Sequence, residues 1–201
     1  MPRGVAIPDL RRRLFDATEH IVRTEGAGAV SGRGVTRRAG VAIGILNRHF
    51  RGLDGFLADY AVDCAFHVTA ESGTFAAGGA SDGAPGPAAA AFLGGLATPQ
   101  LMAALRLEAA RPDLTAEVRR ILGDRAAALG AVDDALAARL TAAHGAGHLP
   151  PGTDPASVAL ALTGTLHHLA LTADTPEDAA DRITATALAL LSPAQRTTGR
   201  R

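Results

Sequence analysis

The chain has 201 residues, and its twenty arginines and twenty acidic residues give a formal net charge of zero. This length allows one large or two small domains with a real hydrophobic core. The charge is unevenly distributed. Residues 1–60 hold ten arginines and six acidic residues, whereas residues 61–201 hold ten arginines and fourteen acidic residues. The asymmetry indicates that a nucleic-acid partner would meet the N-terminal part.

The cysteine content and the apolar runs exclude several other classes of protein. A single cysteine, Cys64, excludes an intramolecular disulfide framework and a cysteine-based zinc site, and it is typical of a reducing cytoplasm. The first nine residues lack the apolar core of a signal peptide. The longest uncharged run, 83–105, contains three prolines and is a poor membrane span. We therefore expect a soluble, cytoplasmic protein with no membrane partner.

The N-terminal third predicts helices, because no stretch shows the period-two alternation of a strand. A first helix over 9–24 has an apolar face that contains Leu10, Leu14 and Ile21. Two short helices are expected at 31–39 and 42–50. An apolar stripe then predicts an amphipathic helix about four turns long. The stripe consists of Leu53, Phe56, Leu57, Tyr60, Ala61, Cys64 and Val68.

The rest of the chain predicts further helices separated by breaks rich in proline and glycine. Residues 78–87 predict a flexible loop, residues 114–143 a long helical stretch, and residues 145–153 a firm break. The last two helices are expected at 155–173 and 176–191. Three expected helix starts have a capping side chain directly before a proline: Thr98-Pro99, Asp154-Pro155 and Thr175-Pro176. The fold class is therefore all-α, with about nine helices.

The helix expected at 155–173 lacks any Asp, Glu, Lys or Arg, so most of its sides must be covered. In a chain of this size the expected cover is a partner subunit, with Leu166 and Leu169 as candidate contacts. His167 and His168 point about 100° apart on this helix. One reading is a hydrogen-bonded interface histidine, and the other is a histidine that faces an internal cavity.

Residues 31–50 have the anatomy of a helix-turn-helix, in which Gly40 can adopt the positive φ that ends the first short helix. The side chains expected to face a small core are Val35, Ala39, Val41, Leu46 and Phe50. Those left outward on the second helix are Ala42, Ile43, Gly44, Asn47, Arg48 and His49. Asparagine pairs with adenine, arginine with guanine or phosphate, and isoleucine touches the thymine methyl group. This face therefore predicts reading of a DNA major groove.

A series of short motifs runs without a gap through residues 10–57: Leu14–Ala17, Glu25-Gly26, Ser31 with Arg33, Arg38–Val41, Gly44–Leu46, His49-Phe50 and Leu53–Leu57. In order and spacing they resemble the DNA-binding domain of the TetR family of bacterial transcriptional regulators. The resemblance implies a helix-turn-helix domain over 1–52 and a helical effector-binding and dimerisation domain over 53–201. It also implies that helices 155–173 and 176–191 form a four-helix bundle with their counterparts in a second copy.

The resemblance further implies which residues contact DNA: Ser31, Arg33, Ala42, Ile43, Gly44, Asn47, Arg48 and His49. The chain departs from the family pattern at Asn47, where tyrosine is usual, and at Leu53, where lysine is frequent. Gly32 and Gly34 are expected to loosen the first short helix by about 1 kcal/mol each. The run Arg11–Arg13 either touches flanking phosphates or forms the charged outer face of the first helix.

The function implied is a homodimeric regulator, a repressor that a small effector releases from a near-palindromic operator in double-stranded DNA. The departures leave an alternative open, a helical ligand-binding dimer with weak or lost DNA binding. The few aromatic residues favour a largely aliphatic effector cavity and an apolar or amphipathic effector. The candidate lining residues are Phe66, His67, Phe92, Met102, Leu105, Arg106 and His168.

Other chemistry lacks a sequence signal. No nucleophile elbow, phosphate-binding loop, dinucleotide fingerprint or zinc-protease motif occurs, so we expect no enzyme and no cofactor. His144 and His148 lack the companion spacing of a zinc site, so no metal is expected. An enzyme in the helical domain would require a closed polar cavity with paired acid and base groups. Cys64 lies on an apolar stripe and is expected to be a buried small hydrophobe rather than a redox switch.

Overall fold

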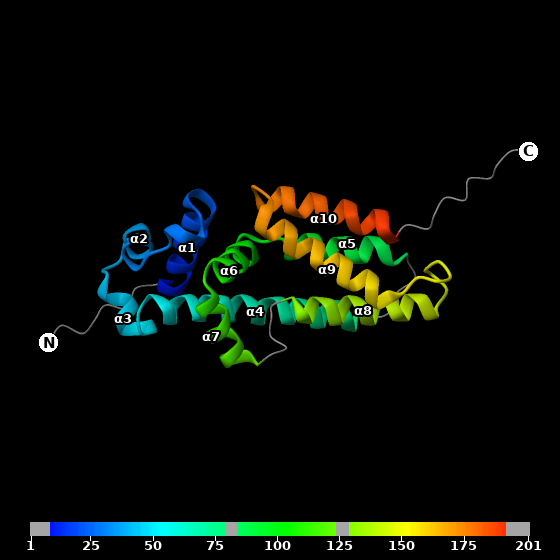
Figure 1. Ribbon diagram of the computed structural model, residues 1–201, viewed down its shortest axis with the longest axis horizontal. Helices are drawn as coiled ribbons and strands as arrows, with labels where there is room; N and C mark the ends of the chain where they lie inside the picture. The colour runs from blue at the N-terminus through cyan, green and yellow to red at the C-terminus, as the bar shows by residue number, and fades with distance from the viewer. Residues whose placement is uncertain (1–8, 79–83, 124–128, 192–201) are drawn as a thin grey trace, which may run out of the picture.

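The computed structural model of the protein describes residues 9–78, 84–123 and 129–191. In these ranges it holds ten α-helices, one short 3-10 helix and no strand (Figure 1). The predicted all-α fold class is confirmed. Three short or medium helices gather at one end of the molecule, and α4 runs from them along the bundle formed by the later helices (Figure 1).

The N-terminal end contains α1 (Leu10–Glu25), a 3-10 turn (Ala27–Ala29), α2 (Gly32–Arg38) and α3 (Gly44–Phe50). These helices form where the sequence predicts them, except that α3 begins two residues after Ala42. They enclose a cluster of aromatic rings. The rings of Phe15 and Tyr60 meet edge to face with their centroids 4.9 Å apart, and those of Phe50 and Phe56 do so at 5.2 Å.

Helix α4 (Leu53–Ala77) has 25 residues and is much longer than the apolar stripe predicts. At 1.5 Å per residue it spans about 37 Å. Its first half is buried against the N-terminal helices and α7, and its second half lies beside α8. Because α4 is one unbroken helix, it connects the helix-turn-helix directly to the helical domain.

The middle of the chain forms α5 (Pro85–Leu96), α6 (Pro99–Ala110), α7 (Pro112–Leu122) and α8 (Gly130–Gly145). Two predictions are wrong here. The loop expected at 78–87 ends early, because Pro85 already occupies the first turn of α5, and its residues 79–83 lie outside the described part. The single helical stretch expected at 114–143 is divided, because α7 ends at Leu122 and the next residue, Gly123, has a φ of +83°.

The last two helices, α9 (Pro155–Thr172) and α10 (Pro176–Leu191), coincide with the predicted ones to within one residue. The three predicted caps also form. Thr98 Oγ1 accepts a hydrogen bond from the amide of Leu101 at 3.2 Å, and Thr175 Oγ1 accepts one from the amide of Asp178 at 3.1 Å. The Asp154 carboxylate accepts from two amides of the first turn of α9. These bonds satisfy amides that the helix itself leaves unpaired.

Within the described residues, no single helix combines the length and apolar character needed to cross a membrane. Helices α5 and α6 reach that length and composition only together, and they are bent by 68° at their break.

The helical domain is held by close packing between helices that are distant in sequence. Helix α5 lies along α10, and a Cβ added at Gly94 would stand 2.7 Å from Thr184 Oγ1. Arg139 of α8 donates a hydrogen bond to the carbonyl of Phe75 at 2.9 Å, and its guanidinium lies over that ring. The Phe75 ring in turn stacks on Phe92, with centroids 4.1 Å apart. Helices α4, α5 and α8 therefore meet at one point.

Gly94→Ala should destabilise the protein by about 1–3 kcal/mol, because the new methyl group overpacks the contact between α5 and α10. The matched control is Gly95→Ala, whose added Cβ meets no atom within 4 Å. It should stabilise the helix by up to about 1 kcal/mol. Urea unfolding followed by circular dichroism measures both, and equal stabilisation by the two substitutions would show that the helices are not in close contact at Gly94.

Candidate nucleic-acid interface

Helix α2 is fixed by hydrogen bonds at both of its ends. Ser31 Oγ accepts from the amide of Gly34 at 3.2 Å and so caps the start of α2. Gly40 has a φ of +66°, as the sequence predicts. Arg13 reaches across from α1 and donates to the carbonyl of Ala39 at 2.5 Å, which places a cation at the C-terminal end of α2.

The helix-turn-helix separates its side chains into an inner and an outer set as predicted. Val35, Ala39, Leu46 and Phe50 are buried, and Val41 is half-buried. The residues expected to contact DNA are all exposed: Ser31, Arg33, Ala42, Ile43, Gly44, Asn47, Arg48 and His49. Ile43 is 56% exposed, so its apolar side chain is accessible on the same face.

The glycines at the start of α2 have a packing role that the sequence does not reveal. A Cβ at Gly32 would stand 3.3 Å from Leu46 Cδ1 and 3.9 Å from Ile43 Cδ1. A Cβ at Gly34 would stand 3.0 Å from Ser31 Oγ, the capping atom itself. The N-terminus of α2 therefore lies directly against α3, and the exposed residues of the two helices form one surface.

Two of the three arginines in the run Arg11–Arg13 have partners within the protein. Arg11 forms an ion pair with Asp63 of α4 at 3.1 Å and lies over the ring of Phe15. Arg13 holds the turn after α2. Both side chains thus connect α1 to its neighbours, whereas Arg37 and Arg38 of α2, which the sequence analysis did not select, are exposed.

The junction between α3 and α4 is very tight. Arg51 adopts a left-handed backbone with a φ of +60°, and Gly52 follows with +101°. The amides of Arg51 and Gly52 both donate to the carbonyl of Leu46, which closes the end of α3. A Cβ at Gly55 would stand 1.9 Å from the carbonyl oxygen of Phe50, so only glycine fits there. Helix α3, which we call the recognition helix after the DNA-reading role that the sequence predicts for it, and the first turn of α4 are consequently held as one rigid elbow.

A chain of polar contacts joins α1, α4 and α6 above this elbow. The Tyr60 hydroxyl lies 3.3 Å from Glu19 Oε1 and 3.2 Å from the carbonyl of Gln100. Gln100 donates through Nε2 to Asp63 at 3.1 Å. Burial raises the pKa of the Glu19 carboxyl, and the hydrogen bond from Tyr60 offsets part of that rise. Burial also raises the pKa of Tyr60, which therefore remains a neutral donor.

The predicted ligand-binding residues do not come together in one cavity. Phe66 is 64% exposed, and His67 and His168 are exposed as well, so these three side chains lie at the surface of the protomer. Their helices bury other faces, through residues such as Val68 and Leu169. Met102 and Leu105 are buried on α6.

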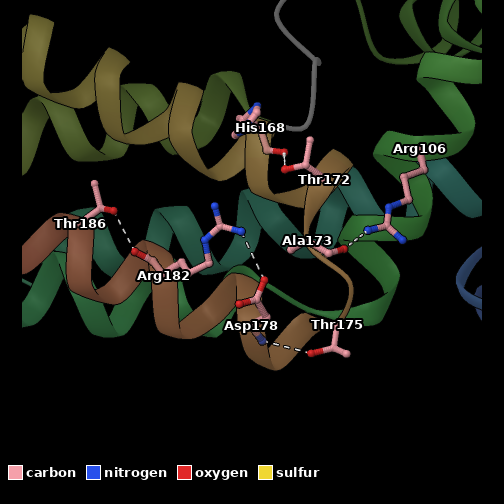
Figure 2. Close-up of polar contacts among 8 residues, drawn as sticks. All are labelled: Arg106, His168, Thr172, Ala173, Thr175, Asp178, Arg182 and Thr186. Atoms are coloured by element: carbon pink, nitrogen blue, oxygen red, sulfur yellow. Dashed lines mark hydrogen bonds and ion pairs between the residues drawn. The ribbon is translucent and has the colours of Figure 1, made fainter.

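The remaining predicted residues have structural partners. Phe92 stacks on Phe75 and is half-buried. Figure 2 shows Arg106 reaching from α6 to the carbonyl of Ala173, at 2.5 Å, and a second bond joins its Nε to the carbonyl of Ala170 at 2.9 Å. Arg106 therefore satisfies carbonyls at the end of α9. In the same view, the carbonyl of His168 accepts from Thr172 Oγ1 at 2.8 Å.

Three side chains of the helical domain bury an oxygen atom without a partner in the described part of the chain, and no sequence motif marks them. Ser72 Oγ of α4, Asp133 Oδ1 of α8 and Thr163 Oγ1 of α9 have no hydrogen-bond partner among the described residues. Each such atom costs about 1–3 kcal/mol when left unpaired. Helix α8 packs on both α4 and α9, so the three residues belong to adjoining helices.

Cys64 is 2% exposed, and burial raises the pKa of its thiol to about 12. The thiolate is therefore scarce at neutral pH, which agrees with the predicted role as a small buried hydrophobe.

Helices α9 and α10 expose two leucines and several small residues, beside charged residues such as Asp181 and Arg182 of α10. Leu160 is 65% exposed and Leu190 is 52% exposed, and Gly164 and Ala185 are also exposed. Leu166 and Leu169, which were expected to contact a partner, are instead at most 2% exposed within the protomer. That expectation is wrong because α9 turns these leucines toward its own domain.

No family model and no curated protein matches the chain, but its fold matches those of solved regulators. The TetR-family regulator PfmR of Thermus thermophilus is 18% identical with a TM-score of 0.68, over 92% of this chain and 100% of that one. A gamma-butyrolactone receptor is 17% identical with a TM-score of 0.65, over 90% and 96% of the two chains. SmeT, the repressor of a multidrug efflux pump of Stenotrophomonas maltophilia, is 19% identical with a TM-score of 0.58, over 90% and 87%. The chain therefore has the fold of TetR-family transcriptional regulators, as the sequence resemblance implies.

The raised pKa of Glu19 predicts how the stability of the contacts between α1 and α4 depends on pH. A carboxyl with a higher pKa in the folded state binds more protons when folded. The protein accordingly loses stability as pH rises from the ordinary value of 4.5 through the folded value. Glu19→Gln should gain stability relative to the wild type at pH 7 but not at pH 4, in urea unfolding.

Glu25→Gln at an exposed position of α1 is the control, because it removes the same charge outside the network. The difference in free energy of unfolding between Glu25→Gln and the wild type should be the same at pH 4 and pH 7. A Glu19→Gln variant that loses more stability at pH 7 than at pH 4 would show that the buried carboxylate is stabilising.

Proposed function

We propose that the protein is a homodimeric, DNA-binding transcriptional regulator that acts as a repressor and that a small molecule releases from its operator. The observation that supports this most directly is the two-sided helix-turn-helix, whose inner residues are buried while every residue expected to contact DNA is exposed. The shared fold with regulators, among them a repressor and a receptor for a small molecule, supports the same conclusion.

The recognition surface has the chemistry that base reading requires. Arg48 can donate two hydrogen bonds to a guanine edge, Asn47 can donate to N7 of adenine and accept from its N6 amino group, and Ile43 offers an apolar contact for a thymine methyl group. Gly44 leaves the start of α3 bare, since nothing lies within 4 Å of a Cβ placed there. Ser31 and Arg33 at the start of α2 would bind backbone phosphates, which position the helix without reading sequence.

The second half of the proposal is a dimer formed through α9 and α10. Their exposed leucines, Leu160 and Leu190, flank small residues that allow helices to approach closely. A two-fold axis through this face would pair it with itself and place the two recognition helices symmetrically. The operator would then be near-palindromic, with half-sites in successive major grooves.

We infer that the effector binds between α4, α8 and α9, where Ser72, Asp133 and Thr163 leave buried oxygen atoms unpaired. Hydrogen bonds from a ligand would satisfy these atoms, and the apolar lining would come from neighbouring leucines and from Met102 and Leu105 of α6. The effector is thus amphipathic, as the sequence suggests, but carries hydrogen-bond donors. Its entry would move α4, and with it the rigid elbow that carries α3.

Arg48→Ala and Asn47→Ala should each weaken DNA binding about tenfold or more, because each removes a bidentate base contact of about 1–3 kcal/mol. Fluorescence anisotropy with the DNA upstream of the protein's own gene measures the affinity. Arg120→Ala on α7 is the matched control, since that arginine is exposed and bonded to Glu117 of its own helix. Unchanged affinity in both recognition variants would place the DNA-reading face elsewhere.

The alternative function, a ligand-binding dimer without DNA affinity, predicts a different result in the same assay. It predicts no salt-sensitive binding of that DNA at micromolar protein, whereas a regulator that neutralises phosphates loses affinity steeply as salt rises.

Leu160→Glu should dissociate the dimer, because it buries an unpaired carboxylate at the centre of the proposed interface. The residue is exposed in the protomer, so the fold itself should be unaffected. Analytical ultracentrifugation measures the change, with Ala138→Glu on the exposed face of α8 as the control. A Leu160→Glu variant that sediments as the wild-type dimer would exclude this face.

A further inference from the structure

A small cavity of about 200 Å³ lies where the helix-turn-helix meets α7, outside the region proposed for the effector. One wall comes from the elbow and the first turns of α4, through Arg51, Asp54 and Leu57. The other comes from the start of α7 and the residue before it, through Arg111, Leu114 and Glu117. Ser72, Asp133 and Thr163 do not line this cavity.

The floor of the cavity is apolar and its rim is charged. Leu57 is fully buried, and Leu114 is 5% exposed. On the rim, Arg111 Nη2 and Asp54 Oδ1 form an ion pair at 2.8 Å that joins the first turn of α4 to the corner between α6 and α7. An apolar floor with a few fixed charges is the usual composition of a small-molecule site.

The charges on the rim leave one cation without a hydrogen-bonded partner. Asp54 is neutralised by Arg111, and both Glu117 oxygens accept bonds from Arg120, at 2.7 and 2.8 Å. Asp113 stands in the first turn of α7, where the helix N-terminus stabilises a carboxylate. In the described part of the chain, the Arg51 guanidinium has neither a hydrogen bond nor an ion pair. Its charge acts on Glu117 through space and, after the hydrogen bond and charge of Arg120, helps to lower the pKa of that carboxyl.

The backbone of Arg51 couples this cavity to the recognition helix. Arg51 directly follows α3 and has a left-handed φ of +60°. The carbonyl oxygen of Phe50 packs directly against Gly55. A non-glycine residue accepts such a backbone at a cost of about 1 kcal/mol. A molecule that bridged Arg51 and α7 would therefore fix the position of α3 relative to the helical domain.

We propose that this cavity is a second ligand site, for a small organic anion whose carboxylate binds Arg51 and whose apolar body packs on Leu57 and Leu114. Guanidinium and carboxylate form paired hydrogen bonds in a fixed geometry, which explains the preference for an anion. The volume accommodates one aromatic ring and its carboxylate. Binding of the anion requires neither DNA nor the effector, so this proposal can succeed or fail independently of the proposed function.

Benzoate is the probe. Two controls carry the same ring, benzyl alcohol with a neutral group and benzylamine with a cationic group. Titration of the full-length, isotope-labelled protein by amide NMR should give millimolar benzoate binding. The shifts should centre on residues 51–57 and 111–117. Benzyl alcohol and benzylamine should bind at least about tenfold more weakly, since they lack the charge-assisted bond to Arg51. Equal binding of the three probes, or tighter binding of benzylamine, would overturn the assignment to an anion.

Arg51→Gln should weaken benzoate binding about tenfold, whereas Arg37→Gln on the exposed face of α2 should leave it unchanged. Both variants lose one positive charge in the same domain, so a general charge effect would weaken them equally. Amide spectra also report whether each variant is folded. Undiminished benzoate binding by folded Arg51→Gln, or benzoate shifts located elsewhere in the protein, would overturn the proposal.

Discussion

The rest of the arrangement depends on the closed backbone between α3 and α4. The carbonyl oxygen of Phe50 occupies the place where any other residue at position 55 would carry its Cβ, and two consecutive residues, Arg51 and Gly52, have positive φ. A turn of this kind fixes the angle between α3 and α4, because a rotation of either helix would bring backbone atoms into collision. The orientation of the recognition helix is consequently set by the direction of α4.

The direction of α4 is in turn set by polar contacts with helices of both domains. Asp63 binds Arg11 of α1, and it also accepts from Gln100 of α6. Asp54 binds Arg111 at the corner of α6 and α7. The Asp54 side chain is 81% exposed, so this pair adds little to stability, about 0–1 kcal/mol. The ion pair instead affects position, because it favours one register of α4 against α7.

The sequence predicts the helix-turn-helix well because its information is local. Each short helix has an inner and an outer face that can be read from spacing alone, and Ser31 and Gly40 mark where α2 begins and ends. The proline-led starts of α6, α9 and α10 are local signals of the same kind. Gly123 is a weaker signal, since glycine also occurs inside helices, and the break after α7 was missed for that reason.

The ligand-binding residues could not be predicted because they depend on which helices are neighbours. Helix α4 buries residues on more than one face along its length, so an apolar stripe does not reveal that Phe66 faces outward. The long-range partners of Arg13 and Arg106 are backbone carbonyls, which carry no sequence signal. Buried atoms without partners, such as Thr163 Oγ1, likewise depend on which helices meet and have no signature in the sequence.

Under the proposed function, the length of α4 would carry a small change in the helical domain to the DNA. Over a helix of about 37 Å, a tilt of about 5° displaces the far end by about 3 Å. This displacement is close to the spacing of successive base pairs, about 3.4 Å. Because the elbow is rigid, α3 would follow that displacement completely. In a two-fold dimer the two displacements are opposite in direction, so they would add in the separation between half-sites. A longer or more flexible junction would absorb the movement, and we therefore regard Gly55 as essential to the proposed regulation as well as to the fold.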